Sequence, residues 1–202
     1  MACHHLLVDI ETLGSKREHC VVLTMACVVF TFEDYTPFST LIRDGFYVKF
    51  SVPDQIKKWK RTTEADTMAW WKGQSKEARE AAYYPRDDDA SMIDGLDAMT
   101  QFIKASKYDW KKSYIWSRGP AFDFPKIESM YDMADMPVPY NGWRQRDVRT
   151  YVDILTGVDN GKYEGKKPLT GFVAHNALHD AARDAFHMQE IFATASGNET
   201  PF

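Results

Sequence analysis

The feature that most constrains the fold is a long, largely apolar run near the N-terminus, residues 20–32 (CVVLTMACVVFTF). It is rich in β-branched and aromatic side chains, a composition typical of a central strand covered on both faces. A shorter apolar run at residues 6–11 is followed by Thr-Leu-Gly, which indicates a buried strand that ends in a turn. Residues 40–50 (TLIRDGFYVKF) predict a third strand with a turn or bulge at Asp44-Gly45. The early chain therefore favours an antiparallel meander.

Helical patterns dominate the rest of the chain. Residues 63–82 and 91–105 carry Ala, Glu, Lys, Trp and Met at helical spacing, and they form most of a helical insertion expected at about residues 55–110. Beyond them we expect a strand at 113–117, a helix at 123–133, an edge strand at 145–148, a helix at 150–155, a loop at 157–169, and a helix at 177–195 with Asn176 as its N-cap. This order predicts an α/β or α+β protein with a mixed central sheet, in a single domain over residues 1–202.

Composition and length agree with one globular domain. Of the 202 residues, 44% are hydrophobic and 27% are charged, enough to bury a substantial core. No apolar run approaches the ~20 residues of a membrane span, and the N-terminus lacks the segments of a signal peptide, so we expect a soluble cytoplasmic protein without membrane contact. Cys3, Cys20 and Cys27 show no CxxC spacing and are expected to be reduced packing residues. The net charge of −4 argues against a basic surface for tight duplex binding, but it allows an enzyme that holds only a strand end.

Two acids at the end of the first predicted strand are candidate metal ligands. Asp9 and Glu11 stand in VDIET, and alternate residues of a strand project to one face, so both carboxylates point the same way. Burying two acids beside apolar neighbours is costly unless a cation neutralises them, and Mg²⁺ or Mn²⁺ prefers such oxygen ligands. A strand that ends at the rim of a sheet also often carries solvated acids, so the pair alone leaves both interpretations open.

A second candidate is Asp123, which stands between two phenylalanines in RGPAFDFPKI. At the start of a predicted helix it is either a metal ligand or an N-cap or first-turn aspartate, a role worth ~1 kcal/mol, and taken by itself the capping role is favoured. The acidic run at residues 87–89 indicates a solvated turn that helps to cap the helix after it. The role of Asp147 in QRDVRT stays open.

The third candidate lies in HNALHD, where His175 precedes a helix and Asp180 falls in its first turns. Such an aspartate can reach back toward the sheet as a ligand, and a histidine on the preceding loop can reach a water. Imidazole titrates near ~6.5, which suits a general base at neutral pH. His179 and Asp184 have the same spacing, but within a helix they would turn away from each other by about 140°. We therefore favour His175 and Asp180, with His179 and Asp184 as solvated or supporting residues; an exposed histidine and a helix-start aspartate without function are the alternative.

The order of these motifs resembles that of a known enzyme class. Asp-x-Glu on the first strand, an Asp after RG-x-x-F, and His-x-x-x-x-Asp near the C-terminus resemble motifs Exo I, Exo II and Exo III of the DEDDh branch of the DnaQ-like, ribonuclease-H-fold exonucleases. The segments TMAWWKGQSKEAR, WSRGPAFDFP, QRDVRT and GFVAHNALHDAARD are similar to the phage DexA exonuclease family. Several ordered motifs that match together are a far more specific signal than any one of them.

The resemblance implies a ribonuclease-H-like fold with a mixed five-stranded sheet flanked by helices. It also implies that the acids of the three motifs bind two Mg²⁺ or Mn²⁺ ions, and that His175 is the general base. These acids are Asp9, Glu11, Asp123 and Asp180. The implied reaction is 3′→5′ hydrolysis of terminal phosphodiesters of single-stranded DNA, which releases 5′-mononucleotides; a phage-encoded protein would act in the host cytoplasm. Many relatives carry a small polar residue shortly before the Exo II aspartate, where this chain has Pro120, Ala121 and Phe122.

An exonuclease must also grip the terminal bases and phosphates of its strand. Aromatic side chains can hold unstacked bases at ~1–3 kcal/mol per base without reading sequence. Candidate strand contacts are Thr12, Leu13, Trp70, Trp71 and Phe122, with Arg118 and Arg149 as phosphate contacts. Because Trp70 and Trp71 are adjacent and cannot share one helix face, at least one of them is expected to lie in the core.

Three alternatives remain on the sequence alone. A 3′→5′ exoribonuclease or oligoribonuclease would use the same residues, because nothing in the chain announces a contact to the 2′-OH. A catalytically silent nucleic-acid-binding or protein-binding module would be marked by loss of one or more acids, and all of them are present. An endonuclease of the ribonuclease H type is the third, and the loop histidine with its downstream aspartate favours the exonuclease.

Overall fold

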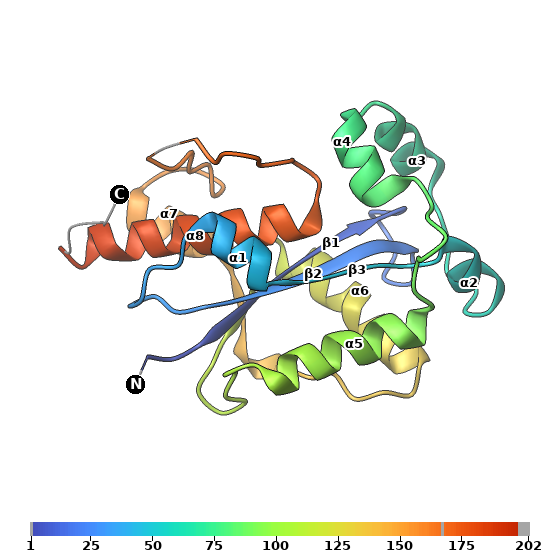
Figure 1. Cartoon of the computed structure of the whole chain (residues 1–202), viewed down its shortest axis with the longest axis horizontal. Coiled ribbons are helices and arrows are strands. Elements are labelled where there is room, and N and C mark those ends of the chain that lie inside the picture. The colour runs from blue at the N-terminus through green and yellow to red at the C-terminus, as the bar shows by residue number, and fades with distance from the viewer. Residues whose placement is uncertain (1, 167, 198–202) are drawn as a thin grey trace.

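A five-stranded mixed sheet forms the centre of the protein (Figure 1). The structure, a computed structural model, describes residues 2–166 and 168–197. The strands are β1 (His5–Thr12), β2 (Val22–Phe30), β3 (Phe46–Lys49), β4 (Ile115–Ser117) and β5 (Gln145–Asp147), in the order β3-β2-β1-β4-β5. β1 and β2 pair antiparallel, as do β2 and β3, whereas β4 runs parallel to β1 and β5 parallel to β4. The predicted mixed sheet flanked by helices is confirmed.

Helices cover both faces of the sheet (Figure 1). One face carries α1 (Phe38–Asp44), α7 (Val148–Thr156) and α8 (Ala177–Ala195), and the other carries α5 (Met92–Ala105) and α6 (Pro120–Met133). Side chains of β1 alternate between these layers, so Leu6 and Val8 pack with α5 and α6, whereas Leu7 packs with α8. Asp9 and Glu11 continue the register of Leu7, and they therefore face α8.

The short helices between β3 and α5 pack beside the end of β1. They are α2 (Val52–Lys57), α3 (Ala65–Lys72) and α4 (Lys76–Ala78), which continues into a π turn at Arg79–Tyr83. Trp71 of α3 is fully buried and donates its Nε1–H to the backbone oxygen of Thr12 at 2.9 Å. This bond ties the helical segment to the last residue of β1. That the segment is an insertion into the sheet domain stays a prediction.

The predicted strand at residues 40–50 is partly wrong. Residues 38–44 form α1, and only residues 46–49 pair with β2. Phe38 and Leu41 are buried in the apolar cluster that α8 covers, so tertiary packing overrides the β propensity of this stretch. Gly45 then turns the chain in a crowded place, because a Cβ there would lie 2.6 Å from Leu178 Cδ1 and 2.7 Å from the Leu41 oxygen.

The other predicted elements differ mainly at their ends. α6 begins at Pro120, a residue suited to the first turn of a helix, and α7 begins at Val148. The predicted helix at 63–82 is divided into α3, α4 and the π turn, with a break after Gly73. α8 and its cap are as predicted, since the Asn176 side chain accepts the backbone N–H groups of the first turn at 3.1 and 3.4 Å.

Two expectations from composition can be compared with the structure. Cys3, Cys20 and Cys27 are free thiols, and the latter two are buried, as predicted. Across the part of the chain that the structure describes, no helix has the length and apolar character required to cross a bilayer.

Candidate active site

The carboxyl ends of two parallel strands bring the candidate ligands together. β1 carries Asp9 and Glu11, and β4 leads directly into α6, whose first turn carries Asp123. Because parallel neighbours end at the same edge of a sheet, these acids meet there. The chain at the start of α8 adds His175 and Asp180, and all five residues line one cavity of about 420 Å³.

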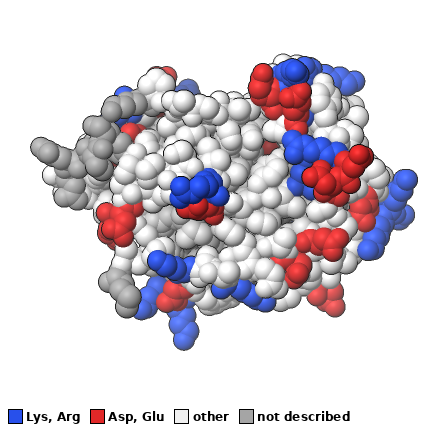
Figure 2. All heavy atoms as spheres, in the orientation of Figure 1, with Lys and Arg blue, Asp and Glu red and all other residues white. Residues whose placement is uncertain are grey.

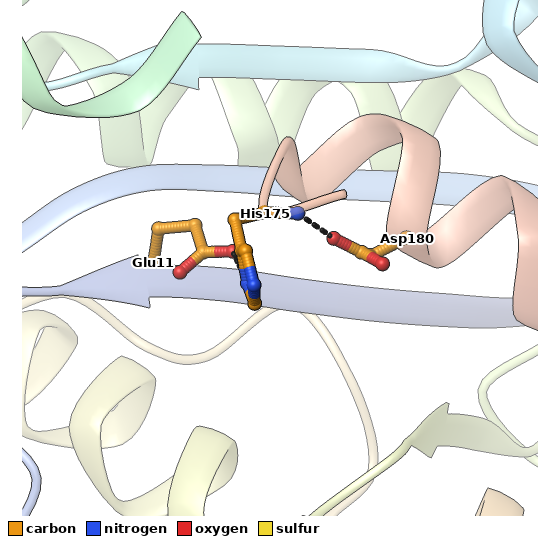
Figure 3. Close-up of side chains that lie close together, drawn as sticks. All are labelled: Glu11, His175 and Asp180. Atoms are coloured by element: carbon orange, nitrogen blue, oxygen red, sulfur yellow. Dashed lines mark hydrogen bonds and ion pairs between the residues drawn. The ribbon is translucent and has the colours of Figure 1, made fainter. Parts of the chain in front are cut away.

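Glu11, His175 and Asp180 bring three potential metal-ligand atoms close together in this cavity (Figure 3). Glu11 Oε1 lies 3.8 Å from His175 Nδ1, and the backbone N–H of His175 donates to Asp180 Oδ2 at 2.8 Å. One ligand atom from each of the three lies within 4.8 Å of the others. His175 has a φ of 61°, a left-handed conformation that non-glycine residues rarely adopt, so the bond to Asp180 helps to hold a strained backbone. Its side chain is 41% exposed and borders both cavity and solvent.

Asp123 is held by a serine that sequence reasoning missed. The N-cap position of α6 is Gly119, so Asp123 is a first-turn residue rather than the N-cap. Ser117 Oγ donates to Asp123 Oδ2 and accepts the Gly119 N–H at 3.0 Å. Ser117 is therefore a small polar residue that precedes the Exo II aspartate and contacts it, whereas Pro120–Phe122 carry no polar side chain. The available signal was a serine at the end of the predicted strand at 113–117.

We use the name acid cluster for the four candidate metal ligands, which are Asp9, Glu11, Asp123 and Asp180. Burial raises the pKa of Asp9 well above its usual value, and the neighbouring carboxylates, Asp123 first, raise it further. Burial and then Asp180 have the same effect on the pKa of Glu11. Burial raises the pKa of Asp123 to about 7, although a serine hydroxyl and nearby cations lower it. Burial also raises the pKa of Asp180, against the effect of a neighbouring arginine. The acid cluster thus has more negative charge than its surroundings balance, and its oxygen donors fit hard divalent cations.

A second group of charges adjoins the acid cluster. Arg118 donates from Nε and Nη2 to both carboxylate oxygens of Asp184, at 2.7 and 2.8 Å. Arg183 donates from Nε to Asp184 Oδ1 at 2.9 Å and from Nη1 to Asp180 Oδ1 at 2.5 Å. Burial alone would raise the pKa of Asp184, which is 1% exposed, but Arg183 and Arg118 outweigh burial and hold it below its usual value. We call Arg118, Arg183 and Asp184 the arginine–Asp184 cluster.

These contacts revise the hypotheses for three residues. Asp184 is not solvated but anchors two arginines, as a supporting residue would. His179 is half-buried, and its Nδ1 accepts the backbone N–H of Val173 at 3.0 Å, so it fixes the loop that leads to His175. Arg118 lines the cavity, but its guanidinium is bound to Asp184 and to the Gly161 oxygen, the latter at 3.0 Å. It is therefore less free to bind a phosphate than the sequence indicated.

The predicted strand contacts divide into accessible and buried residues. Trp70 is 45% exposed, with its ring centroid 4.8 Å from that of His175, and Phe122 lines the cavity. Trp71 is 0% exposed, and Thr12 and Leu13 are each 5% exposed. These last three are structural in this conformation, because the turn after β1 packs beneath α3 and α4.

Two other acidic features of the sequence have structural roles. Asp147 caps α7, since its side chain accepts from the Arg149 backbone N–H at 3.1 Å and from Thr150 Oγ1 at 2.7 Å. In the run at residues 87–89, Asp89 accepts the Arg86 N–H at 3.0 Å and so closes a turn. The predicted capping by this run is wrong, because Ser91 itself caps α5.

Comparisons with known proteins identify relatives among nucleases. A family model described as "3'-5' exoribonuclease Rv2179c-like domain" matches residues 4–192. The exodeoxyribonuclease of Enterobacteria phage T4 is 34% identical over 210 residues, which cover 96% of this chain and 91% of that protein. The structure of the nuclease domain of 3′hExo, a DEDDh family member, bound to rAMP, aligns with a TM-score of 0.56 at 14% identity over 94% of this chain and 92% of that one. E. coli exonuclease I in complex with a dA16 oligonucleotide aligns with a TM-score of 0.59 at 13% identity, over 96% of this chain but 42% of the longer enzyme.

The chain has the fold of the DEDDh class of nucleases, and the family model and the sequence relative that match it both describe exonucleases. Within that class, the chain belongs to the family of the 3′-5′ exoribonuclease Rv2179c-like domain. The resemblance to DEDDh exonucleases and to a phage enzyme, drawn from the sequence, is confirmed.

Proposed function

We propose that this protein removes nucleotides one at a time from the 3′ end of single-stranded DNA by metal-dependent hydrolysis, and that it releases 5′-mononucleotides. The observation that carries the proposal is the convergence of the acid cluster and His175 on one cavity that opens to solvent. Acids of like charge raise one another's pKa there, an arrangement typical of a site that gains stability only when cations bind.

The acid cluster would hold two Mg²⁺ or Mn²⁺ ions. Its carboxylates supply the hard oxygen ligands that these ions prefer, and Asp9, whose pKa is raised by all of the other acids, would be one of the residues that hold them. The chemistry that such ions would supply is activation of the attacking water and stabilisation of the leaving oxygen in a phosphoryl displacement. Ser117 and Arg183 would fix the orientation of Asp123 and Asp180 toward the cavity.

His175 would act as the general base. Its ring lies at the cavity wall beside Glu11, where an imidazole nitrogen can accept a proton from the attacking water. Because the side chain is partly exposed, the proton can pass to solvent after each turnover. Trp70 packs edge-to-face against the ring and limits its rotation, with an interplanar angle of 82°.

DNA is the proposed substrate because the relative that aligns over nearly the full length of both chains is named an exodeoxyribonuclease. On the face seen in Figure 2, basic and acidic side chains are interspersed rather than gathered into a basic surface. Together with the net charge of −4, this mixture favours binding of a strand end over binding along a duplex. RNA is the second candidate, because the matching family is described as exoribonuclease-like.

Digestion of 5′-labelled single strands tests these proposals. With Mg²⁺ or Mn²⁺ we expect a ladder that shortens one nucleotide at a time, and with EDTA no cleavage. Asp9→Asn should abolish the ladder, whereas Asp97→Asn, an exposed acid of α5, should leave it unchanged. Internal cuts would contradict the exonuclease proposal.

A second assay separates DNA from RNA. Matched DNA and RNA strands are compared with a DNA strand that ends in a single ribonucleotide, so that only the terminal 2′-OH differs. We expect the highest kcat/KM on the all-DNA strand. Faster digestion of RNA and of the mixed strand would assign the protein to RNA instead.

A further inference from the structure

The cavity is lined by arginines of two kinds. Arg118 and Arg183 are bound to Asp184, and Arg183 also to Asp180, so their charges are balanced within the protein. Arg149 also lines the cavity, yet within residues 2–166 and 168–197 its side chain forms no ion pair or hydrogen bond. It is therefore the cavity arginine whose guanidinium contacts no carboxylate of the described residues, although its charge lies close enough to lower the pKa of Asp123.

The position of Arg149 places this charge beside the acid cluster. A Cβ on Gly119 would lie 3.7 Å from Arg149 Nη1 and 3.9 Å from Asp123 Oδ2, so both groups border the same space at the start of α6. Asp123 is 4% exposed, whereas Arg149 is an exposed residue in the first turn of α7. The acids thus lie at the base of the cavity and the free guanidinium lies nearer its rim.

The backbone and aliphatic part of Arg149 are held in place, although its guanidinium forms no ion pair or hydrogen bond with the part of the chain that the structure describes. Asp147 accepts its backbone N–H, and Gly161 packs against its side chain. A Cβ on Gly161 would lie 2.9 Å from Arg149 Cγ and 2.9 Å from Arg118 Nη1. Gly161 also has a φ of 69°, so both the close contacts and the backbone conformation favour glycine at this position. A fixed stem that ends in an unpaired guanidinium is suited to binding an external anion, because little side-chain freedom is lost on binding.

We propose that Arg149 binds the non-scissile phosphodiester immediately 5′ of the bond that is cut, a role that rests on the proposed function. The scissile phosphate must reach the acids at the base of the cavity, and the strand then leaves past the rim toward its 5′ end. The first phosphate that it meets there is the neighbouring one. A guanidinium binds such a group through charge-assisted hydrogen bonds that an ammonium reproduces only in part.

The experiment combines a protein change with a change in the substrate. Arg149→Ala is compared with Arg146→Ala, a matched exposed arginine three residues earlier on β5 that lies over the Tyr114 ring. Substrates are a normal strand, a strand with an uncharged methylphosphonate at the second linkage from the 3′ end, and a strand with the same group at the fourth linkage. Binding in Ca²⁺ by fluorescence anisotropy and kcat and KM in Mg²⁺ are both measured.

We expect Arg149→Ala to weaken binding of the normal strand about ten-fold, with a similar rise in KM and little change in kcat. Arg149→Lys should recover part of the loss, and Arg146→Ala should resemble the unchanged protein. On the second-linkage methylphosphonate the unchanged protein and Arg149→Ala should bind equally, whereas on the fourth-linkage strand the ten-fold difference should persist.

Two results would overturn the assignment. One is an Arg149→Ala protein that binds the normal strand as tightly as the unchanged protein. The other is a ten-fold difference that survives the neutral second linkage. Because anisotropy requires no cleavage, a protein that binds strands but cuts none would defeat the proposed function while still testing Arg149.

Discussion

The acid cluster and the arginine–Asp184 cluster adjoin each other, yet the pKa values of their buried carboxylates are shifted in opposite directions. Asp180 and Asp184 lie one turn apart on α8, and burial by itself raises the pKa of both. At Asp184 two arginines outweigh burial, and its pKa falls below the usual value. At Asp180 and Asp9 the compensation is partial or missing, and the pKa rises.

This difference supports the proposal that the arginine–Asp184 cluster stabilises the fold, whereas the acid cluster binds cations. A buried ion pair that is complete within the protein needs nothing further, and removing one partner is costly. Buried acids without enough cations nearby destabilise the metal-free fold, so their presence at a solvent-open cavity supports the proposal that cations bind there. Arg183, a member of the arginine–Asp184 cluster, also binds Asp180 of the acid cluster and so links the two.

The largest expected effect is that of neutralising the centre of the acid cluster. Asp9→Asn should lower kcat by about 10³-fold or more, because a proposed metal ligand at the centre of the acid cluster is lost. In EDTA the same protein should be at least as stable as the unchanged one, since a buried charge among like charges is removed. Initial rates and thermal unfolding measure the two effects. If Asp9→Asn turned over at a near-normal rate, or clearly lost stability in EDTA, the proposal that the acid cluster serves metal binding rather than the fold would be contradicted.

The next effect concerns the residue between Glu11 and Asp180. His175→Ala should lower kcat by about 10²–10⁴-fold with little change in KM, the range expected for loss of a general base. Added imidazole should restore part of the rate, which is measured at saturating substrate. A His175→Ala enzyme with a normal kcat would assign the residue to structure alone.

Removing the shared carboxylate of the arginine–Asp184 cluster should mainly lower the stability of the protein. Asp184→Asn leaves Arg118 and Arg183 without their shared carboxylate and should cost about 3 kcal/mol in the free energy of unfolding, measured by urea denaturation. Asp97→Asn, at an exposed position on α5, should change it by less than about 0.5 kcal/mol. If Asp184→Asn were as stable as this control, the arginine–Asp184 cluster would not stabilise the fold as proposed.

The smallest effect is the pH dependence of the metal-free protein. For an acid with a raised folded-state pKa, stabilisation is fully present below its usual value of 3.8 and is lost as pH rises through the folded value, about 7 for Asp123. The pKa of Asp184 is lowered, so its contribution is already complete above 3.8. In EDTA the Tm should therefore fall by roughly 5 °C from about pH 5 to about pH 8.

Two controls accompany this measurement. Saturating Mn²⁺ should flatten the decline, and Asp9→Asn should reduce its slope, because each relieves the repulsion among the acids. A Tm in EDTA that is constant or rises over this pH range would contradict the raised pKa values in the acid cluster.

Local patterns predicted those parts of the site that neighbouring residues determine. The alternation of a strand was enough to put Asp9 and Glu11 on one face, and Asn176 before an apolar helix was enough to locate the start of α8. The order of the motifs then pointed to the exonuclease class, which the relatives confirm.

Contacts between distant residues were beyond the reach of such patterns. Arg118 and Asp184 are 66 positions apart, and nothing local marks them as partners. Residues 38–44 became a helix because α8 covers them, although their composition favours a strand. The sequence indicated that at least one of Trp70 and Trp71 is buried, but only the packing beside β1 selects Trp71.

The left-handed backbone of His175 has a consequence for protein engineering. Glycine at this position would relieve the strain of its 61° φ while removing the imidazole. A library selected only for heat resistance should therefore enrich glycine at position 175, and with His175 in its proposed role as general base these variants would be well folded but slow in hydrolysis. Thermostable variants of this protein should be sought with activity in the screen, because at this residue selection for durability and selection for turnover favour different amino acids.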